Sequence, residues 1–340
     1  MKPRTIGAMP TINRRTLLQA AVGAAALTVM ALRAAHSQLS GAIEVLNLDW
    51  ADVTRQRKVP VRLYLPSALQ TRGDRVPLLV FSHGIGGSRR GYSYLGTHMA
   101  SHGVASLHLQ HVGSDGSLWT GNMFSLVSRL QGAAGDSEAV ARARDVHFAL
   151  DTLLATGAPD GVAGRIDASR IVAAGHSYGA NTTLLVAGAR VERDGRHLNL
   201  RDDRVRAAIA ISAPPFYGES EPRRILGAVT VPSLHVTATE DVIRIPGYFS
   251  GAQDRVDVFD AVGSTRKWLA VFEGGSHSMF TDRAGTGGLT LNPQVKAATQ
   301  ALALAFVRTV FDGDTAALAA WPQQHKAILA QFRVQPAATA

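Results

Sequence analysis

The amino-acid sequence predicts an α/β protein in which a mostly parallel central sheet is covered by helices. Apolar runs of strand length alternate with segments of helical periodicity along most of the chain. One apolar run leads directly into Gly175-His-Ser-Tyr-Gly, a G-x-S-x-G pattern, and a helix-compatible segment follows it. The chain is 46% hydrophobic, and its sequence contains no internal repeat and no charged segment long enough to be a linker. We therefore expect a single domain over residues 38–340, preceded by an export signal over residues 1–37.

The first 37 residues have the pattern of a signal peptide. Four basic residues, the last two being Arg14 and Arg15, precede a mostly apolar run over residues 17–32, and small residues follow. The Arg14-Arg15 pair resembles a twin-arginine export motif. An uncleaved anchor is the alternative, but a bilayer span needs about 20 apolar residues. We expect a periplasmic or secreted protein without a stable membrane anchor once the signal is removed.

Charge and cysteine content exclude several classes of function. The formal net charge is +9, and residues 1–37 contribute five basic residues and no acid, which leaves +4 for the rest of the chain. No basic stripe with interleaved aromatic residues is present, so nucleic-acid binding is not expected. The absence of cysteine excludes disulfides, thiolate metal sites and a cysteine nucleophile.

The elements of the expected sheet can be taken in order. Residues 43–48 and 59–65 alternate apolar with polar, which predicts two half-buried strands. Residues 76–81 are continuously apolar, as expected for a central strand that is covered on both faces. Residues 112–136 are glycine-rich and irregular. The later strands are expected at 104–109, 171–174, 207–211, 233–236 and 268–272, and the helices at 94–102, 137–154, 181–187 and 292–311.

Ser177 is the candidate nucleophile. A strand that turns sharply into a helix holds such a serine in a strained backbone conformation, the geometry called a nucleophile elbow. Gly175 and Gly179 flank it where strand and helix backbones crowd together and a Cβ would clash. The free N–H groups of the helix N-terminus favour negative charge that develops nearby.

A serine hydroxyl needs a base and an orienting carboxylate, which in α/β-hydrolases follow it in the order acid, then histidine. His277 lies in a glycine-containing loop just after the strand 268–272, whereas His235 lies inside a strand, where a core role is favoured. Glu240 and Asp241 follow the strand between Ser177 and His277, and successive extended residues point in opposite directions. We choose His277 as base and Asp241 as acid, with Glu240 as the alternative acid.

The oxyanion of the tetrahedral intermediate needs two N–H donors. The backbone N–H of Tyr178 is one by elbow geometry. The second is expected from the glycine-rich loop of residues 83–87, from Ile85 first and Gly84 second. His83 is expected to brace this loop by hydrogen bonding rather than to transfer protons.

Four aromatic residues are candidate walls of a substrate pocket, because loops at strand C-terminal ends line the site in such sheets. They could equally belong to ordinary surface loops. They are Trp119 and Phe124 in the irregular segment, and Phe216 and Tyr217.

Two further pairs have structural explanations. Arg142 and Asp145 lie three residues apart on the helix 137–154, where a structural ion pair is expected. His108 and His111 point to opposite faces of an extended segment without neighbouring carboxylates, so no metal site is expected there.

Five motifs carry a resemblance to a known family. Phe81-Ser-His-Gly-Ile-Gly-Gly-Ser, Gly91-Tyr-Ser-Tyr-Leu, Gly175-His-Ser-Tyr-Gly, Thr239-Glu-Asp and Gly275-Ser-His are similar to motifs of the α/β-hydrolases grouped with platelet-activating-factor acetylhydrolase and predicted dienelactone hydrolases. The resemblance extends from about residue 48 to 312. It implies an α/β-hydrolase fold and a serine carboxylesterase or lipase-like acyl hydrolase that uses no cofactor. True dienelactone hydrolases use a cysteine nucleophile, so that part of the family description does not transfer.

The sequence therefore predicts an exported serine hydrolase that cleaves small-molecule or lipid esters through an acyl-enzyme. The same triad could serve a thioesterase, a peptidase or an acyltransferase. A catalytically silent binding module on a hydrolase fold is the rival from a different class.

Overall fold

The computed structural model describes residues 43–67, 75–155, 162–193, 195–245, 247–282 and 289–335. These residues belong to one compact unit. The expected export signal, residues 1–37, lies outside the described residues. Within the described ranges, no helix combines the length and apolar composition needed to cross a bilayer.

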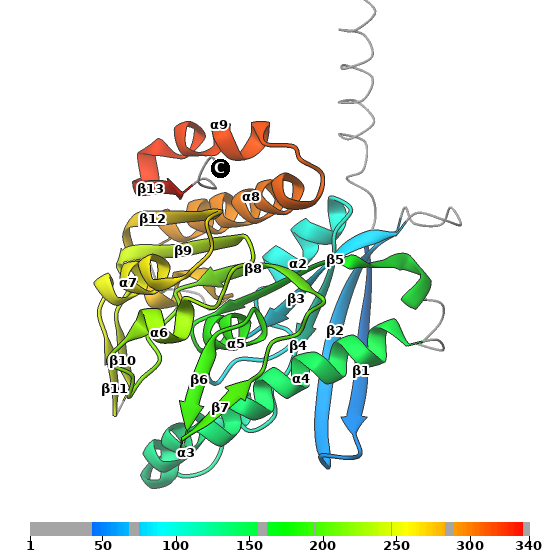
Figure 1. Ribbon diagram of the computed structural model, residues 1–340, viewed down its shortest axis with the longest axis vertical. Coiled ribbons are helices and arrows are strands. Elements are labelled where there is room, and N and C mark those ends of the chain that lie inside the picture. The colour runs from blue at the N-terminus through cyan, green and yellow to red at the C-terminus, as the bar shows by residue number, and fades with distance from the viewer. Residues whose placement is uncertain are drawn as a thin grey trace, which may run out of the picture. The chain divides into compact units, whose positions relative to one another are not determined.

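A mostly parallel sheet of nine strands forms the centre of the described unit (Figure 1). The order across the sheet is β1 (Ile43–Asp52), β2 (Arg57–Pro66), β4 (Ala105–Leu109), β3 (Val76–Ser82), β5 (Ile166–His176), β8 (Val205–Ile211), β9 (Ser233–Glu240), β12 (Lys267–Ser276) and β13 (Leu329–Gln335). In this order, the six strands from β4 through β12 are parallel to one another, while β1, β2 and β13 run antiparallel to their neighbours. Both β3 and β4 are buried along their whole length, which explains the continuous apolar run at residues 76–81.

Helices cover both faces of this sheet and enclose two large apolar clusters (Figure 1). On α4 (Asp136–Leu154), buried apolar residues recur at positions 143, 146, 149, 150 and 153, the spacing of a helix with one face against a core. The arrangement is that of the α/β-hydrolase fold, which confirms the fold class predicted from the sequence. One face carries α4 (Asp136–Leu154), α5 (Tyr178–Val186), α6 (Pro222–Leu226) and α7 (Gln253–Ala261), and the other α2 (Ser93–Ser101), α8 (Leu291–Phe311) and α9 (Ala316–Gln324).

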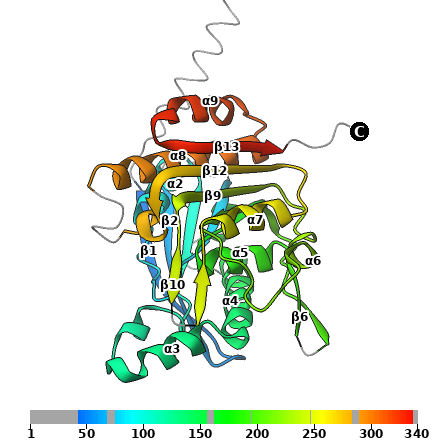
Figure 2. The same cartoon turned by 90° about the vertical axis from the view of Figure 1, so that its left-hand side faces the viewer.

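Several short or peripheral elements were not predicted from the sequence. Two antiparallel hairpins project beyond the main sheet, and the C-terminal α9 and β13 lie along α8 and β12 (Figure 2). The strand β12 is therefore not the last one, because β13 covers its outer edge. The hairpins are β6 (Arg190–Arg193) with β7 (Arg196–Asn199) and β10 (Ile243–Ile245) with β11 (Tyr248–Ser250); α3 spans Leu126–Ala133, and 3₁₀ turns span Gly116–Trp119, Met123–Ser125, Ala163–Arg165, His277–Phe280 and Lys326–Ile328.

The C-terminal ends of four parallel strands gather the candidate functional residues at one edge of the sheet. His83 is the first residue after β3, and Ser177 is the first after β5. Asp241 and His277 stand in the same position after β9 and β12. Loops at this edge form the ligand crevice of open α/β sheets, so the topology alone brings residues up to 194 positions apart into one region.

Candidate active site

The turn between β5 and α5 is a strained strand-to-helix connection. Ser177 has φ 55° and ψ −124°, a conformation that a non-glycine residue adopts only when its surroundings impose it. A Cβ on Gly179 would lie 1.9 Å from the carbonyl oxygen of Ser82, and one on Gly175 would lie 2.2 Å from the carbonyl oxygen of Gly179. Only glycine fits at both positions, and α5 begins immediately after the serine, at Tyr178.

Three side chains from separate loops meet in one hydrogen-bonded chain. The Oγ of Ser177 lies 2.8 Å from Nε2 of His277. The other ring nitrogen, Nδ1, lies 2.7 Å from Oδ1 of Asp241. With Nδ1–H donating to the carboxylate, Nε2 is left free to accept the serine proton, which is the geometry that nucleophilic catalysis by serine requires.

Asp241 is held as a buried carboxylate. It is fully buried, and its second oxygen, Oδ2, accepts a 2.7 Å hydrogen bond from Oγ1 of Thr237. The buried guanidinium of Arg255 lies 3.4 Å from Oδ1. Burial alone would raise the pKa of Asp241, but the hydrogen bond with His277 and the charge of Arg255 outweigh it and hold the pKa well below its usual value. The neighbouring Glu240 is exposed.

His176, the residue before the serine, has a role that the sequence analysis missed. Its Nδ1 lies 2.8 Å from the hydroxyl of Tyr92, and its Nε2 lies 2.9 Å from the backbone carbonyl of His277. A carbonyl can only accept, so Nε2 carries the proton and Nδ1 accepts from the tyrosine. Burial, together with the nearby His277, lowers the pKa of His176 to about 3, so the ring stays neutral. The signal in the sequence was the residue type itself, a histidine directly before the serine of the G-x-S-x-G motif.

The loop after β3 is fixed by hydrogen bonds that orient its peptide groups. The N–H of Gly86 donates to the carbonyl of Ser114 at 2.8 Å, and the N–H of Gly87 donates to the carbonyl of Gly84 at 3.0 Å. Within the described residues, the N–H groups of Ile85 and Tyr178 donate to no other backbone group. These two amides, both beside Ser177 in the cavity lining, are therefore available to a ligand.

His83 braces this loop. Its Nδ1 donates to the carbonyl of Gly84 at 2.7 Å, and its Nε2 accepts from the N–H of His111 at 3.1 Å. Burial and the nearby Arg142 hold the pKa of His83 well below its usual value, which keeps it neutral in this donor–acceptor pattern.

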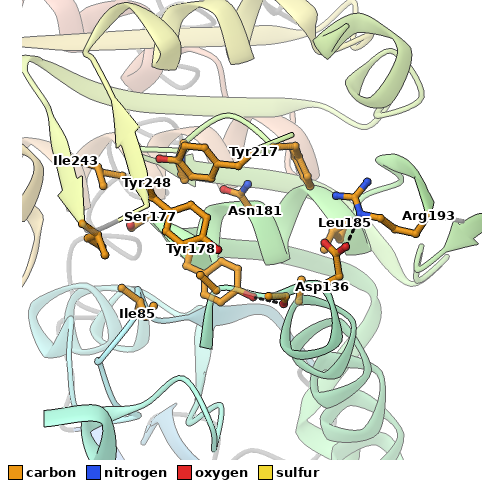
Figure 3. A pocket seen from close by; sticks show the side chains of 16 residues that line it. Ile85, Asp136, Ser177, Tyr178, Asn181, Leu185, Arg193, Tyr217, Ile243 and Tyr248 are labelled. Carbon is orange, nitrogen blue, oxygen red and sulfur yellow. Dashed lines mark hydrogen bonds and ion pairs between the residues drawn. The ribbon is translucent and has the colours of Figure 1, made fainter. Parts of the chain in front are cut away.

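Two cavities meet at Ser177. The first, of about 280 Å³, runs along α5 from Ser177 past Asn181 to Leu185, and Arg193 and Asp136 stand at its far end (Figure 3). The second, of about 670 Å³, passes the imidazole of His277. Ile85, Ile243 and Ile245 line both cavities.

The four aromatic candidates divide between these cavities and solvent. Phe216 and Tyr217 line the first cavity, and Trp119 lines the second, where its Nε1 donates to the carbonyl of Gly86 at 2.9 Å. Phe124 differs from the expectation: its side chain is 98% exposed and lines neither cavity. It lies in a 3₁₀ turn just before α3, and the phenyl ring is directed to solvent.

The expected pair between Arg142 and Asp145 is also corrected. Within the described residues they share no hydrogen bond: Asp145 binds Arg55, Arg57 and His111, while Arg142 binds groups of the loop after β3 and of α5. The side chain of His235 is buried in the core beside Phe259, as a core role requires. No cluster of three potential metal-binding side chains occurs in the described ranges.

A comparison with protein families identifies one of them in the first part of the chain. The family model described as platelet-activating factor acetylhydrolase, isoform II, matches residues 39–124, which include the loop after β3 and end before Ser177. No curated protein sequence matches the chain. The family match confirms the resemblance predicted from the motifs, and it supports a hydrolase that acts on esters.

Proposed function

We propose that this chain is an exported serine hydrolase that cleaves carboxylic esters through an acyl-enzyme intermediate. The observation that carries the proposal is the continuous hydrogen-bonded chain from Ser177 through His277 to Asp241, at 2.8 and 2.7 Å. Export rests on the N-terminal pattern alone, and the N-terminal residue of the protein purified from its own cells would test it.

In the first half of the reaction, the Oγ of Ser177 attacks the ester carbonyl carbon while Nε2 of His277 takes the hydroxyl proton. The carbonyl π electrons move to oxygen, and the resulting oxyanion accepts hydrogen bonds from the N–H groups of Tyr178 and Ile85. Collapse of this intermediate breaks the bond to the alcohol, which leaves with the proton that His277 holds.

In the second half, water enters beside His277, gives a proton to Nε2 and attacks the acyl carbon. The second tetrahedral intermediate uses the same two N–H groups. Ser177 recovers its proton from His277 as the carboxylic acid leaves. Each oxyanion donor in such a hole is worth about 2.7–4 kcal/mol of barrier.

The two cavities suit the two halves of an ester. The first is lined largely by apolar side chains, such as Leu185, Pro214 and Phe216, and suits the acyl group. The second, larger cavity adjoins His277, where the leaving alcohol must receive its proton, and suits the alcohol portion.

The decisive experiment is the substitution Ser177→Ala in the purified protein. We expect hydrolysis of p-nitrophenyl butyrate to fall by several orders of magnitude with folding retained, because the residues of a triad act as a unit. Ser169→Ala is the matched control: it lies on the same strand, β5, where its hydroxyl bonds Asp167 at the surface. Unchanged turnover by Ser177→Ala would refute the proposal.

Two measurements separate the rival functions. A fluorophosphonate should label the wild-type protein at Ser177, as found by mass spectrometry, and should not label Ser177→Ala; a silent binding module would not be labelled. Added alcohol competes with water for the acyl-enzyme, so a predominance of new ester over acid would identify a transferase instead.

A further inference from the structure

A fully buried arginine lies beneath the loop after β3. Arg142 projects from α4 and is 0% exposed, and each of its three guanidinium nitrogens donates a hydrogen bond to a different segment. Its Nη1 donates to Oγ of Ser114 at 2.8 Å, its Nη2 donates to the carbonyl of His83, and its Nε donates to Oγ1 of Thr182 at 2.9 Å.

Two of these contacts hold the loop that carries Gly84 and Ile85. The carbonyl of His83 belongs to the same peptide group as the N–H of Gly84. Ser114 accepts the N–H of Gly86 through its own carbonyl at 2.8 Å. A hydrogen bond to one end of a peptide group fixes its plane and polarises its other end. Arg142 therefore fixes the peptide group that carries the Gly84 N–H directly. The next peptide group, which carries the Ile85 N–H, is held at its Gly84 carbonyl by Nδ1 of His83 and the N–H of Gly87, so Arg142 acts on it through the His83 backbone.

The other contacts hold the elbow. Oγ1 of Thr182, which accepts from Arg142, donates in turn to the carbonyl of Tyr178 at 3.1 Å. The guanidinium carbon also lies 4.5 Å from the centroid of the Tyr178 ring, within cation–π distance. The residue whose N–H is the first oxyanion donor is thus held through both its side chain and its backbone.

An ordinary ion-pair role does not explain this burial. Arg55 and Arg57, in the same polar cluster, bind the carboxylates of Asp145 and Glu138. Arg142 makes no salt bridge among the described residues, and its N–H groups donate to neutral oxygens, two of hydroxyls and one of a backbone carbonyl. Burial lowers the pKa of Arg142 to about 10, so it remains a cation at neutral pH. The nearby carboxylates of Glu138 and Asp145 favour the charged form, but neither forms a salt bridge with the guanidinium, whose hydrogen bonds go to the loop after β3 and to the elbow.

We propose that Arg142 is the positioning residue of the oxyanion hole, holding the donors on the loop after β3 and on the elbow in register with each other. This inference rests on the proposed function. The guanidinium does not reach the substrate; it acts through the peptide groups that do. The positive charge beneath those donors also favours the oxyanion over the neutral carbonyl of the substrate.

The test compares Arg142→Lys with Arg57→Lys. A lysine ammonium cannot meet three acceptors in a plane as a guanidinium does. For Arg142→Lys we expect kcat to fall on the order of 10²-fold with KM changed by less than about threefold, since a small misplacement of catalytic groups has this cost. Arg57→Lys disturbs the same cluster without touching the loop or the elbow, and its kcat should stay within about twofold of wild type at a comparable loss of Tm.

Binding of a boronic acid provides a readout that a merely structural role would not move. A boronic acid forms a tetrahedral adduct with the serine, whereas the product carboxylic acid does not. In Arg142→Lys, the Ki of an alkyl boronic acid should rise in proportion to the loss of kcat, while the Ki of the product acid stays the same. Equal kcat losses in the two lysine variants, or an unchanged boronic-acid Ki, would overturn the inference.

A milder variant keeps the test decisive if Arg142→Lys does not fold. Thr182→Val is nearly isosteric and removes one acceptor of Arg142 together with the bond to the Tyr178 carbonyl. It should lower kcat by about tenfold with KM unchanged. Full kcat in Thr182→Val with an unchanged boronic-acid Ki would reject the positioning role of Arg142. Failure of the proposed serine mechanism would appear in a different experiment, as unchanged turnover by Ser177→Ala.

Discussion

At the scale of single residues, His277 is held at two points. Its ring is oriented by a 2.7 Å hydrogen bond to Asp241, and its backbone carbonyl accepts a 2.9 Å hydrogen bond from Nε2–H of His176. Because Nδ1 of His176 accepts a hydrogen bond from the Tyr92 hydroxyl, the tautomer of His176 is fixed with the proton on Nε2. Burial lowers the pKa of His176 to about 3, so the ring stays neutral and keeps both hydrogen bonds at neutral pH. The proposed base is therefore positioned by Asp241 on one side and by the pair His176 and Tyr92 on the other, and this pair also lines the second cavity.

The carboxylate can be tested against its neighbour in the chain. Asp241→Asn keeps the shape of the side chain but removes the charge that stabilises the imidazolium and selects its tautomer. In a serine protease the equivalent change lowers kcat about 10⁴-fold, and we expect a similar loss here in p-nitrophenyl butyrate hydrolysis. The exposed Glu240→Gln is the control and should keep kcat within about twofold. A larger loss in Glu240→Gln than in Asp241→Asn would assign the acid to Glu240.

Residue types and their order predict the positions that meet in the site, because Ser177, Asp241 and His277 each follow a recognisable apolar run. The partners of Arg142 could not be predicted in the same way. They lie 28 to 59 positions away along the chain, and its nearest acidic neighbour on the helix suggested a pair that does not form. Phe124 shows the same difficulty, since an aromatic residue in a loop lines a pocket or faces solvent according to how the turn before α3 folds.

At the scale of elements, burial decides what the sequence can predict. The central strands are buried on both faces, so their composition is distinctive, and α8 is long enough to show its period. The hairpins β6–β7 and β10–β11 have strands of three or four residues, too short for an alternation to be recognised. These same hairpins contribute Arg193, Ile243 and Tyr248 to the cavity beside Ser177, so the shape of the pocket could not be predicted.

The hairpin β6–β7 provides a test of acyl-chain length. Arg193 binds Asp136 at 2.6 Å and also Glu219, and it lines both the first cavity and a small apolar space of about 40 Å³ beyond it. Arg193→Ala should join the two spaces. We expect the optimum of kcat/KM in a p-nitrophenyl ester series to move to longer acyl chains, with each newly buried methylene adding up to about fourfold.

Arg224→Ala is the control for this series. Arg224 pairs with Glu192 of the same hairpin and is mostly exposed, but it does not line either space. Its chain-length profile should match that of the wild type. If Arg193→Ala and Arg224→Ala give the same profile, the ion pair at the end of the cavity does not limit the acyl chain.

At the scale of the whole molecule, several histidines are kept neutral inside the fold. His83, His108, His111, His176 and His235 are each at most 2% exposed. Burial is the largest cause of the lowered pKa in all five, to about 4 for His108 and about 3 for His176 and His235. The unfolded chain regains ordinary histidines that titrate near pH 6.5.

This difference has a definite sign. Between the lowered pKa values and about 6.5, the unfolded chain binds protons that the folded chain does not, so the free energy of unfolding rises with pH. Stability is fully present above about pH 6.5 and is lost as the pH falls toward 4, by up to about 1.4 kcal/mol per pH unit for each such histidine. The lowered pKa of Asp241 acts in the same direction below about pH 3.8. Burial raises the pKa of Asp145, so above about pH 3.8 the folded chain holds a proton there that the unfolded chain has lost, which opposes the effect of the histidines.

Urea unfolding at about pH 8, 6 and 5 measures this dependence, and His235→Phe tests its cause. The ring of His235 packs edge-on against Phe259 at 5.3 Å and has only a 3.3 Å contact with Oγ of Ser233, so phenylalanine can replace its packing without its proton. In this variant the slope of unfolding free energy against pH should fall by the contribution of about one bound proton, or about 1.4 kcal/mol per pH unit. A slope that is flat between about pH 5 and 7 in the wild type, or equal in wild type and His235→Phe, would show that the buried histidines do not set the acid limit of this fold.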